Sequence, residues 1–487
     1  MELRTEPEDA SALRTVATGG LTLDHVWTVV AIAAAGIFAL LGRMHTADLA
    51  YHLRAGIDIL TSHRLPRVDT YTFSVPGRTW VDQQWGAQVV LALAYRIGGF
   101  GALAFLRAAI VATAFGFLWL ACRARGASPR TSALLTIGGL GVAVLNTGMR
   151  PQTLAYPLFT CSLWILAARR SHPRRLWALP IVAVCWANLH GSFGLLPLLI
   201  ALAAIEDVRD RAATLRTTAT VGAATVGATL VNPFGLGAWR YAVGIATNAR
   251  IRDQIVEWQP TSVRTVAGVL FFLSALAVAA FLARRAASTD RITLLWLGTF
   301  FVLALPALRG IVWWGFVVPV VLAGLLPTGR GAAERRGNPA TNLLVVAMLI
   351  ALVGVLLPWW RAAPDPRTDA SALLELAPQR LVDAARTDLP PGARLLVSQP
   401  IASWFEFAWP SAPVFVDSRI ELFPDGIWAD YDAVMAGREG WQGILDRWRV
   451  DAVVLMPGDT ALASLLSRDR GWRLAYRDGQ GSVYVRA

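Results

Sequence analysis

Long apolar runs are the feature that most restricts how this chain can fold. Residues 26–42, 267–283 and 311–326 contain no charged side chain, and each is close to the length of about 17 to 20 residues that crosses the hydrocarbon core of a bilayer. With 55% hydrophobic and only 16% charged residues over 487 positions, the chain has too little polar surface for a water-soluble protein. The runs predict a polytopic α-helical membrane protein, because a helix satisfies its own backbone hydrogen bonds within lipid.

About eleven such runs are predicted to span the bilayer. They divide the chain into a cytoplasmic segment at 1–25, a transmembrane domain at 26–360 with a first exported loop at 43–100, and a soluble domain at 361–487. The predicted spans are residues 26–42, 101–121, 131–148, 153–168, 176–187, 193–205, 217–231, 267–283, 292–308, 311–326 and 343–360.

The distribution of arginine predicts the orientation of these spans. The chain contains no lysine, so its 45 basic residues are all arginine. Short arginine-rich loops at 123–130, 169–175, 284–291 and 330–336 fall on one side of the predicted spans. Positively charged loops face the cytoplasm, which places the N-terminus inside the cell and the C-terminal domain outside, in a multi-pass plasma-membrane protein. The net charge of +12 is therefore partly a signal of topology, and no basic stripe in a soluble segment indicates a nucleic acid partner.

The tail shows a different pattern after a proline-containing linker at 364–366. Short stretches with strand-like alternation recur between segments with helical spacing. This alternation predicts a small extracytoplasmic α/β domain. The predicted strands are residues 393–398, 413–418, 450–457, 472–478 and 481–487.

A dense group of polar side chains begins where the first span ends, in the stretch MHTADLAYHLRAG at 44–56. Asp48 and His52 are four residues apart, so a helix would place them on one face. Arginine pairs with phosphate and aromatic rings stack on sugars, so the loop predicts a carbohydrate or phosphate site. An interfacial helix with an aromatic belt is the alternative for the loop, and helix capping is the alternative for Asp48. Further candidates in this loop are Arg54, Asp82 and Gln83.

Polar residues also mark the outer ends of later spans. Arg150, Arg252 and Arg309 lie on the side where positive charge is otherwise scarce, and an arginine there gains most by meeting an anion such as a lipid phosphate. We expect Arg252 or Arg309, rather than Arg150, to make that contact. A snorkelling side chain or a structural ion pair is the alternative for each. Other candidates at this face are Gln152, Asn188, His190 and Glu257.

In the tail, Asp417, Arg419 and Glu421 alternate along a segment predicted to be extended, so their side chains would share one side. We expect Asp417 and Arg419 to help seat an acceptor, and the alternative is a structural ion pair. A divalent cation held by Asp48, His52 and either His190 or Glu257 has less support, because hard cations bind several oxygen ligands and these residues offer few. The sequence indicates no other cofactor.

Four segments, DLAYHLRAG (48–56), LPRVDTYTFSVPGRTWVDQQWGAQ (65–88), NLHGSF (188–193) and VFVDSRIELFP (414–424), resemble blocks of a known family. The family is the type C (GT-C) glycosyltransferase superfamily, and the likeness is to bacterial members related to protein O-mannosyltransferases and arabinosyltransferases. The resemblance covers nearly the whole chain: one span, a long exported loop that opens with an acid, many further spans and an exported C-terminal domain.

The resemblance implies that a sugar is transferred, with inversion, from a polyprenyl-phosphate donor to an acceptor outside the cytoplasm. The acceptor would be an envelope glycan, a lipid or a protein. An acid in the first exported loop, here Asp48, would deprotonate the acceptor hydroxyl. Two other functions stay open. One is a transporter or flippase of a lipid-linked saccharide, which is expected to contain internal repeats that the sequence does not show. The other is a non-catalytic subunit of envelope assembly.

Overall fold

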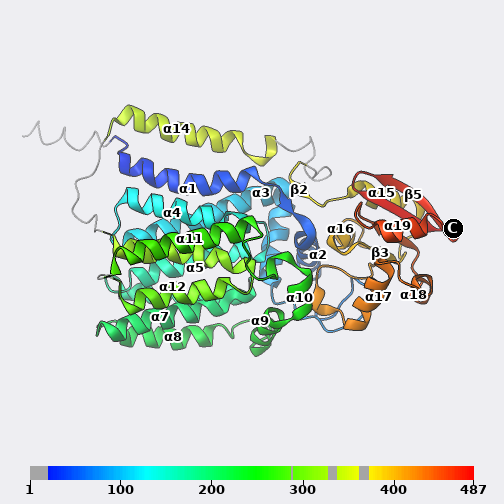
Figure 1. Ribbon diagram of the computed structural model, residues 1–487, viewed down its shortest axis with the longest axis horizontal. Helices are drawn as coiled ribbons and strands as arrows, with labels where there is room; N and C mark the ends of the chain where they lie inside the picture. The colour runs from blue at the N-terminus through cyan, green and yellow to red at the C-terminus, as the bar shows by residue number, and fades with distance from the viewer. Residues whose placement is uncertain (1–19, 287–288, 327–336, 361–371) are drawn as a thin grey trace, which may run out of the picture.

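The computed structural model describes residues 20–286, 289–326, 337–360 and 372–487. A bundle of long helices forms one part of the molecule, and a smaller unit of helices and strands from the C-terminal end forms the other (Figure 1). Helices α2 (Thr46–Ser62), α9 (Leu236–Thr247) and α10 (Ala249–Gln254) lie between the two parts. The candidate site lies in this middle layer.

Every stretch predicted to span the membrane contains a helix. Five helical segments of the described residues are long and apolar enough to cross a bilayer, so the helices are those of a membrane protein. The predicted number of spans is not confirmed, because several helices are shorter, and α6 has nine residues. The helices of the bundle are α1 (Leu23–Leu41), α3 (Trp85–Ala124), α4 (Pro129–Ala143), α5 (Pro151–Ala167), α6 (Leu179–Ala187), α7 (Leu195–Arg209), α8 (Leu215–Ala228), α11 (Val266–Ala283), α12 (Arg291–Ala304), α13 (Ile311–Leu325) and α14 (Pro339–Val355).

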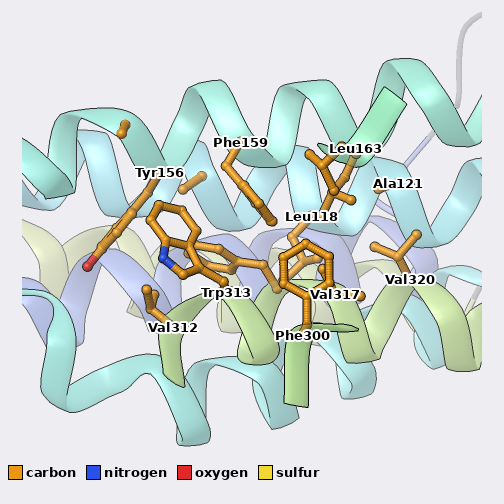
Figure 2. Packing of buried hydrophobic residues seen from close by; sticks show 14 of the residues in the cluster. Leu118, Ala121, Tyr156, Phe159, Leu163, Phe300, Val312, Trp313, Val317 and Val320 are labelled. Atoms are coloured by element: carbon orange, nitrogen blue, oxygen red, sulfur yellow. The ribbon is translucent and has the colours of Figure 1, made fainter. Parts of the chain in front are cut away.

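Small and aromatic residues pack the bundle. A Cβ on Gly139 of α4 would lie 2.5 Å from the carbonyl oxygen of Gly315 in α13, so only glycine lets these two backbones approach so closely. The ring centroids of Phe159 and Trp313 are 4.7 Å apart, and Phe300 lies 5.8 Å from Phe159 (Figure 2). Contacts of this kind hold membrane helices together, because lipid removes the hydrophobic driving force between them.

The first loop, which was predicted to be exported, is largely helical. α2 follows directly on the short strand β1 (Met44–His45), and α3 begins at Trp85, well before the predicted span at 101–121. Gly98 and Gly99 interrupt α3 with non-helical backbone angles. Gly99 has a φ of 60°, a conformation that favours glycine. This break coincides with the predicted end of the exported loop at residue 100.

The C-terminal unit contains a mixed four-stranded sheet in the order β3-β4-β6-β5. β3 (Leu395–Val397) and β4 (Ala452–Leu455) are parallel, whereas β6 (Gly481–Arg486) runs antiparallel to β4 and to β5 (Trp472–Asp478). These four strands lie within predicted strand segments. The helices of the unit are α15 (Gln379–Asp388), α16 (Gln399–Ala408), α17 (Asp425–Met435), α18 (Trp441–Arg447) and α19 (Thr460–Leu466).

The prediction of a strand at 413–418 was wrong. Val414 makes only single bridges, to Leu395 of β3 and to Thr72 of the first loop. Beyond it the chain turns into the short 3-10 helix η8 (Ile420–Leu422). Three consecutive apolar residues of this segment, Val414 to Val416, are buried, but its backbone joins the sheet to the first loop and then leaves the sheet.

The apolar core of the C-terminal unit continues into the first loop. Leu49 and Leu53 of α2 are fully buried in the same cluster as Leu395 and Phe405 of the C-terminal unit. β1 also pairs in parallel with β2 (Leu374–Glu375). The part predicted as a separate domain at 361–487 therefore packs on α2 through an apolar interface.

An ion-pair network joins helices at the opposite end of the bundle. Beyond the end of α5, the buried Arg169 pairs with Asp207 at 2.8 Å and with Glu206 at 3.3 Å. Arg125, which follows α3, contacts both oxygens of Glu206 at 2.9 and 3.2 Å, and Thr218 of α8 donates to Asp207 at 2.8 Å. Breaking such a buried pair leaves an uncompensated charge, so the network fixes the ends of α3, α5, α7 and α8 to one another.

Candidate active site

Asp48 lies in the first turn of α2, on the wall of a cavity of about 290 Å³ between the bundle and the C-terminal unit. Its carboxylate makes no hydrogen bond or ion pair within the described part of the chain, so it does not cap α2 by a hydrogen bond, although its place in the first turn also suits the helix dipole. One wall of the cavity comes from the outer ends of the bundle and the other from the C-terminal unit. The lining residues are His45, Ala47, Asp48, Met149, Arg150, Gln254, Ile255, Val256, Glu257, Gln399, Pro400 and Ser418.

The surroundings of Asp48 make it a stronger base than a carboxylate in water. Burial raises its pKa, and the positive charge of Arg150 is the largest opposing effect. The charge of Glu257 adds to the rise, and Arg309 and His45 oppose it. The pKa stays above its usual value, because removing water from a carboxylate penalises its charged form. A raised pKa increases the driving force for taking a proton from a hydroxyl group.

Two arginines stand near Asp48, and their partners differ. Arg150 pairs with Glu257 at 2.8 Å. Burial, the largest single effect, would raise the pKa of Glu257, but the charge and hydrogen bond of Arg150, the charge of Arg309 and a backbone hydrogen bond together bring the pKa below its usual value. Glu257 is therefore ionised, and it neutralises much of the charge of Arg150.

Arg309 is held only by neutral groups. It donates to the side-chain oxygen of Gln152 at 3.0 and 2.7 Å, and its Nη2 lies 3.2 Å from Nε2 of His190. Its guanidinium lies over the ring of Trp258, 4.4 Å from the ring centroid. No carboxylate of the described residues lies within 4 Å of it. Arg309 thus combines a fixed orientation with a charge that no ion pair neutralises, which suits an anion.

Two of the predicted arginines lie apart from this group. Arg252 is exposed, and its nearest carboxylate is that of Asp253 at 4.0 Å. Arg54 pairs with Asp58 at 2.9 Å, and Tyr71 donates to the same carboxylate. Neither arginine lines the cavity.

A second polar group lies behind the cavity, around Asp82. Gln88 donates to Asp82 at 2.6 Å, and the same nitrogen lies 3.3 Å from Nδ1 of His52. Burial and the charge of Arg150 lower the pKa of His52 to about 3, so this ring is neutral. Gln83 donates to the carbonyl of Ala187 at 2.7 Å. One buried oxygen on each of Asp82, Gln83 and Gln88 has no hydrogen-bond partner in the described structure.

Asn188 has a supporting role in the same region. Its side chain accepts from the indole of Trp85 at 3.0 Å and donates to the carbonyls of Val184 and Val231. These bonds tie the start of α3 to the link between α6 and α7. They leave little of the amide free for a ligand.

Asp82 gives a pH-dependent prediction. Burial raises its pKa to about 7, whereas an aspartate carboxyl in an unfolded chain has a pKa of about 3.9. Between these values the folded chain keeps a proton that the unfolded chain releases, so stability falls as the pH rises through this window. Asp82→Asn, which mimics the protonated form, is expected to melt at a higher temperature than the wild type at about pH 8 and near the wild-type temperature at about pH 4. Thermal unfolding in detergent checks this, and an equal difference at both pH values would contradict it.

Asp417 and Arg419 form a buried ion pair rather than a wall of the cavity. Both are fully buried, and Arg419 also contacts Asp69 of the first loop at 2.6 Å. The guanidinium lies over the rings of both Tyr71 and Trp80, 4.8 and 4.5 Å from their centroids.

The expectation that Asp417, Arg419 and Glu421 share one side of an extended segment was wrong. Glu421 lies in the 3-10 helix η8, and this turn directs its side chain away from Asp69. The carboxylate of Glu421 accepts a hydrogen bond from Tyr241 at 2.7 Å. The cavity instead meets Ser418 and Gln399. No local signal identified these two residues, because only the packing of the C-terminal unit brings them near Asp48.

The divalent-cation alternative finds no group to support it. Within the residues that the structure describes, no cluster of three or more His, Cys, Asp or Glu side chains could hold a metal ion.

Comparison with known proteins identifies the fold. No protein-family model matches the chain, and no curated protein sequence matches it. A crystal structure of ArnT from Cupriavidus metallidurans bound to undecaprenyl phosphate matches with a TM-score of 0.53 and 15% sequence identity, covering 98% of each chain. ArnT is a type C glycosyltransferase, so the fold predicted from the sequence resemblance is confirmed.

Proposed function

We propose that this chain, which has the fold of a type C glycosyltransferase, transfers a sugar from a polyprenyl-phosphate donor to an acceptor outside the cytoplasm. The observation that carries the proposal is the unpaired carboxylate of Asp48 in a cavity that Arg150 also lines. The charge of Arg309, which has no ion-pair partner among the described residues, acts on the same carboxylate. That ArnT has been crystallised with undecaprenyl phosphate supports a lipid phosphate as the donor carrier. The acceptor is a hydroxyl group of an envelope glycan, a lipid or a protein.

The chemistry needs a base on one side of the sugar and an anion site on the other. Asp48 removes the proton from the acceptor hydroxyl while the oxygen of that hydroxyl attacks the anomeric carbon. The bond between that carbon and the phosphate oxygen breaks, and the phosphate leaves with the electron pair, so the configuration inverts. Arg309 and Arg150 stabilise the charge that develops on the phosphate, which matters most in the transition state.

The arginines supply a test of this donor site. Arg309→Gln and Arg150→Gln are each expected to weaken the binding of undecaprenyl phosphate to the full chain in nanodiscs by about 10- to 100-fold, the effect of losing a hydrogen bond from a charged group. Arg252→Gln is the matched control, because Arg252 is exposed and does not line the cavity. Equilibrium binding of the radiolabelled lipid measures all three.

Normal binding by the Arg309 and Arg150 variants would remove the donor site from this cavity. A loss confined to the Arg252 variant would instead place the anion site at Arg252, one of the two arginines preferred from the sequence. A melting temperature for each variant separates lost binding from lost folding.

The orientation of the site supports an extracytoplasmic reaction. The cavity lies at the start of α5, and the arginine-rich segment 169–175 lies beyond its other end. Positively charged loops face the cytoplasm, so we place the cavity and the C-terminal unit outside the plasma membrane and the N-terminus inside.

The transporter alternative receives no support from the bundle. Alternating access requires helices to separate at each membrane face in turn. The pairs of Arg169 with Asp207 and of Arg125 with Glu206 join the ends of α3, α5 and α7 at the end remote from the cavity. An enzyme that opens only toward the outer face keeps these pairs, whereas a transporter would have to move these helices together as one unit.

A further inference from the structure

The C-terminal unit holds the beginning of the helix that carries Asp48. The backbone N–H of Met44 donates to the carbonyl of Leu373 at 2.8 Å. β1 then pairs with β2, and α2 starts at the next residue. A contact with the C-terminal unit is therefore present just before the helix begins.

The hydroxyl of Thr46 extends this contact into α2. It lies 2.7 Å from the carbonyl oxygen of Glu375 and 2.5 Å from that of Leu376, and Thr46 itself is 1% exposed. Leu376 has a φ of 58°, a conformation that is unfavourable for a residue with a Cβ and persists only where the surrounding structure imposes it. This backbone conformation therefore accompanies the hydrogen bond that reaches α2.

A third contact comes from the other side of the C-terminal unit. The hydroxyl of Ser418 donates to the carbonyl of Ala47, the residue before Asp48, at 2.6 Å. Ser403 of α16 donates in turn to Ser418 at 3.1 Å. Ser418 also stands between Asp417 and Arg419, whose buried ion pairs keep this segment in place.

We propose that Thr46 and Ser418 are positioning residues through which the C-terminal unit sets the place of the general base. The proposal rests on the proposed function and adds a dependence within it: turnover requires the C-terminal unit to be docked on residues 44–47. Binding of the lipid phosphate does not, because the arginines that serve it belong to the bundle. A small displacement of a catalytic group is costly, and about 1 Å can lower a rate by about 100-fold.

The test compares Thr46→Val, which removes the hydroxyl and keeps the shape, with Thr46→Ser, which keeps the hydroxyl. Thr46→Val is expected to lower kcat by about 10- to 100-fold, with the donor KM and the affinity for undecaprenyl phosphate unchanged. Thr46→Ser is expected to turn over like the wild type. Ser418→Ala should repeat the Thr46→Val result and carries the test if Thr46→Val does not fold. Thr61→Val is the control, because it removes an exposed hydroxyl near the other end of α2.

Turnover is measured as the undecaprenyl phosphate that the full chain releases from donors in which a hexose or a pentose is linked to this lipid. The acceptors come from an envelope extract of a strain that lacks this protein. Normal turnover in Thr46→Val and Ser418→Ala would overturn the proposal. So would an equal loss in Thr46→Ser, or a loss of lipid affinity that matches the loss of turnover. Asp48→Asn is measured alongside: if it stays active, the assignment of Asp48 as the base in the proposed function fails, and if it is inactive while Thr46→Val is normal, only this inference fails.

Discussion

Asp48→Asn is expected to lower turnover by roughly 10²- to 10⁴-fold, the range in which general bases contribute. Asparagine keeps the size of the side chain and cannot take a proton. The base acts on the acceptor hydroxyl only in the transition state, so the binding of undecaprenyl phosphate should stay close to normal. The same assay of released undecaprenyl phosphate measures turnover, and equilibrium binding of the labelled lipid measures affinity.

Asp58→Asn is the matched control for this prediction. It changes a carboxylate of the same helix that pairs with Arg54 away from the cavity. Asp69 is unsuitable as a control, because it is buried against Arg419. Near-normal turnover in Asp48→Asn together with loss in Asp82→Asn would move the base further along the first loop. Near-normal turnover in both would show that neither carboxylate is the base, and a wild-type chain without turnover would favour a non-catalytic subunit.

Arg419→Ala is expected to destabilise the chain by about 3 to 5 kcal/mol, the cost of removing one partner from a buried ion pair. Arg419 is the cation between Asp69 and Asp417, and its charge also acts on the buried Glu406. Burial and the negative charge of Asp417 raise the pKa of Glu406 well above its usual value. Without Arg419, the remaining carboxylates have to be protonated or exposed. Thermal unfolding of the full chain in detergent measures the loss.

Arg447→Ala provides the comparison within the same unit. Arg447 is 60% exposed and pairs with Asp430 at 2.6 Å. Exposed pairs contribute at most about 1 kcal/mol, so its melting temperature should change little. If Arg419→Ala melts as Arg447→Ala does, the buried charges do not hold the first loop to the C-terminal unit.

The apolar runs predicted the helices because a lipid-facing helix needs a continuous run of apolar residues. Their number was harder to predict, since the run that contains α6 forms a helix of only nine residues. The alternation in the tail predicted β5 and β6 well, because neighbouring residues of a strand face opposite sides. The same reasoning failed at Val414, whose neighbours are buried by contacts with the first loop rather than by continuous strand pairing.

The sequence could predict a candidate site residue where its location follows from its position along the chain. Asp48 is the first acid after the first span, which places it near the outer face of the membrane in any similar fold. The ranking of the arginines was not predictable, because Arg252 and Arg309 both lie close to span ends. Arg252 points to solvent from the short helix α10, whereas Gln152 and His190 hold Arg309 from other helices. Contacts between residues so distant in sequence leave no local pattern.

A cryo-EM map of the Asp48→Asn chain in nanodiscs that contain undecaprenyl phosphate tests the central claim most directly. The account predicts phosphate density beside Arg309 and Arg150, at the edge of the cavity that residue 48 lines, with the prenyl chain running between bundle helices. A phosphate bound elsewhere on the chain would contradict it. So would a cavity without lipid density in which Arg309 still contacts Gln152 and His190 alone.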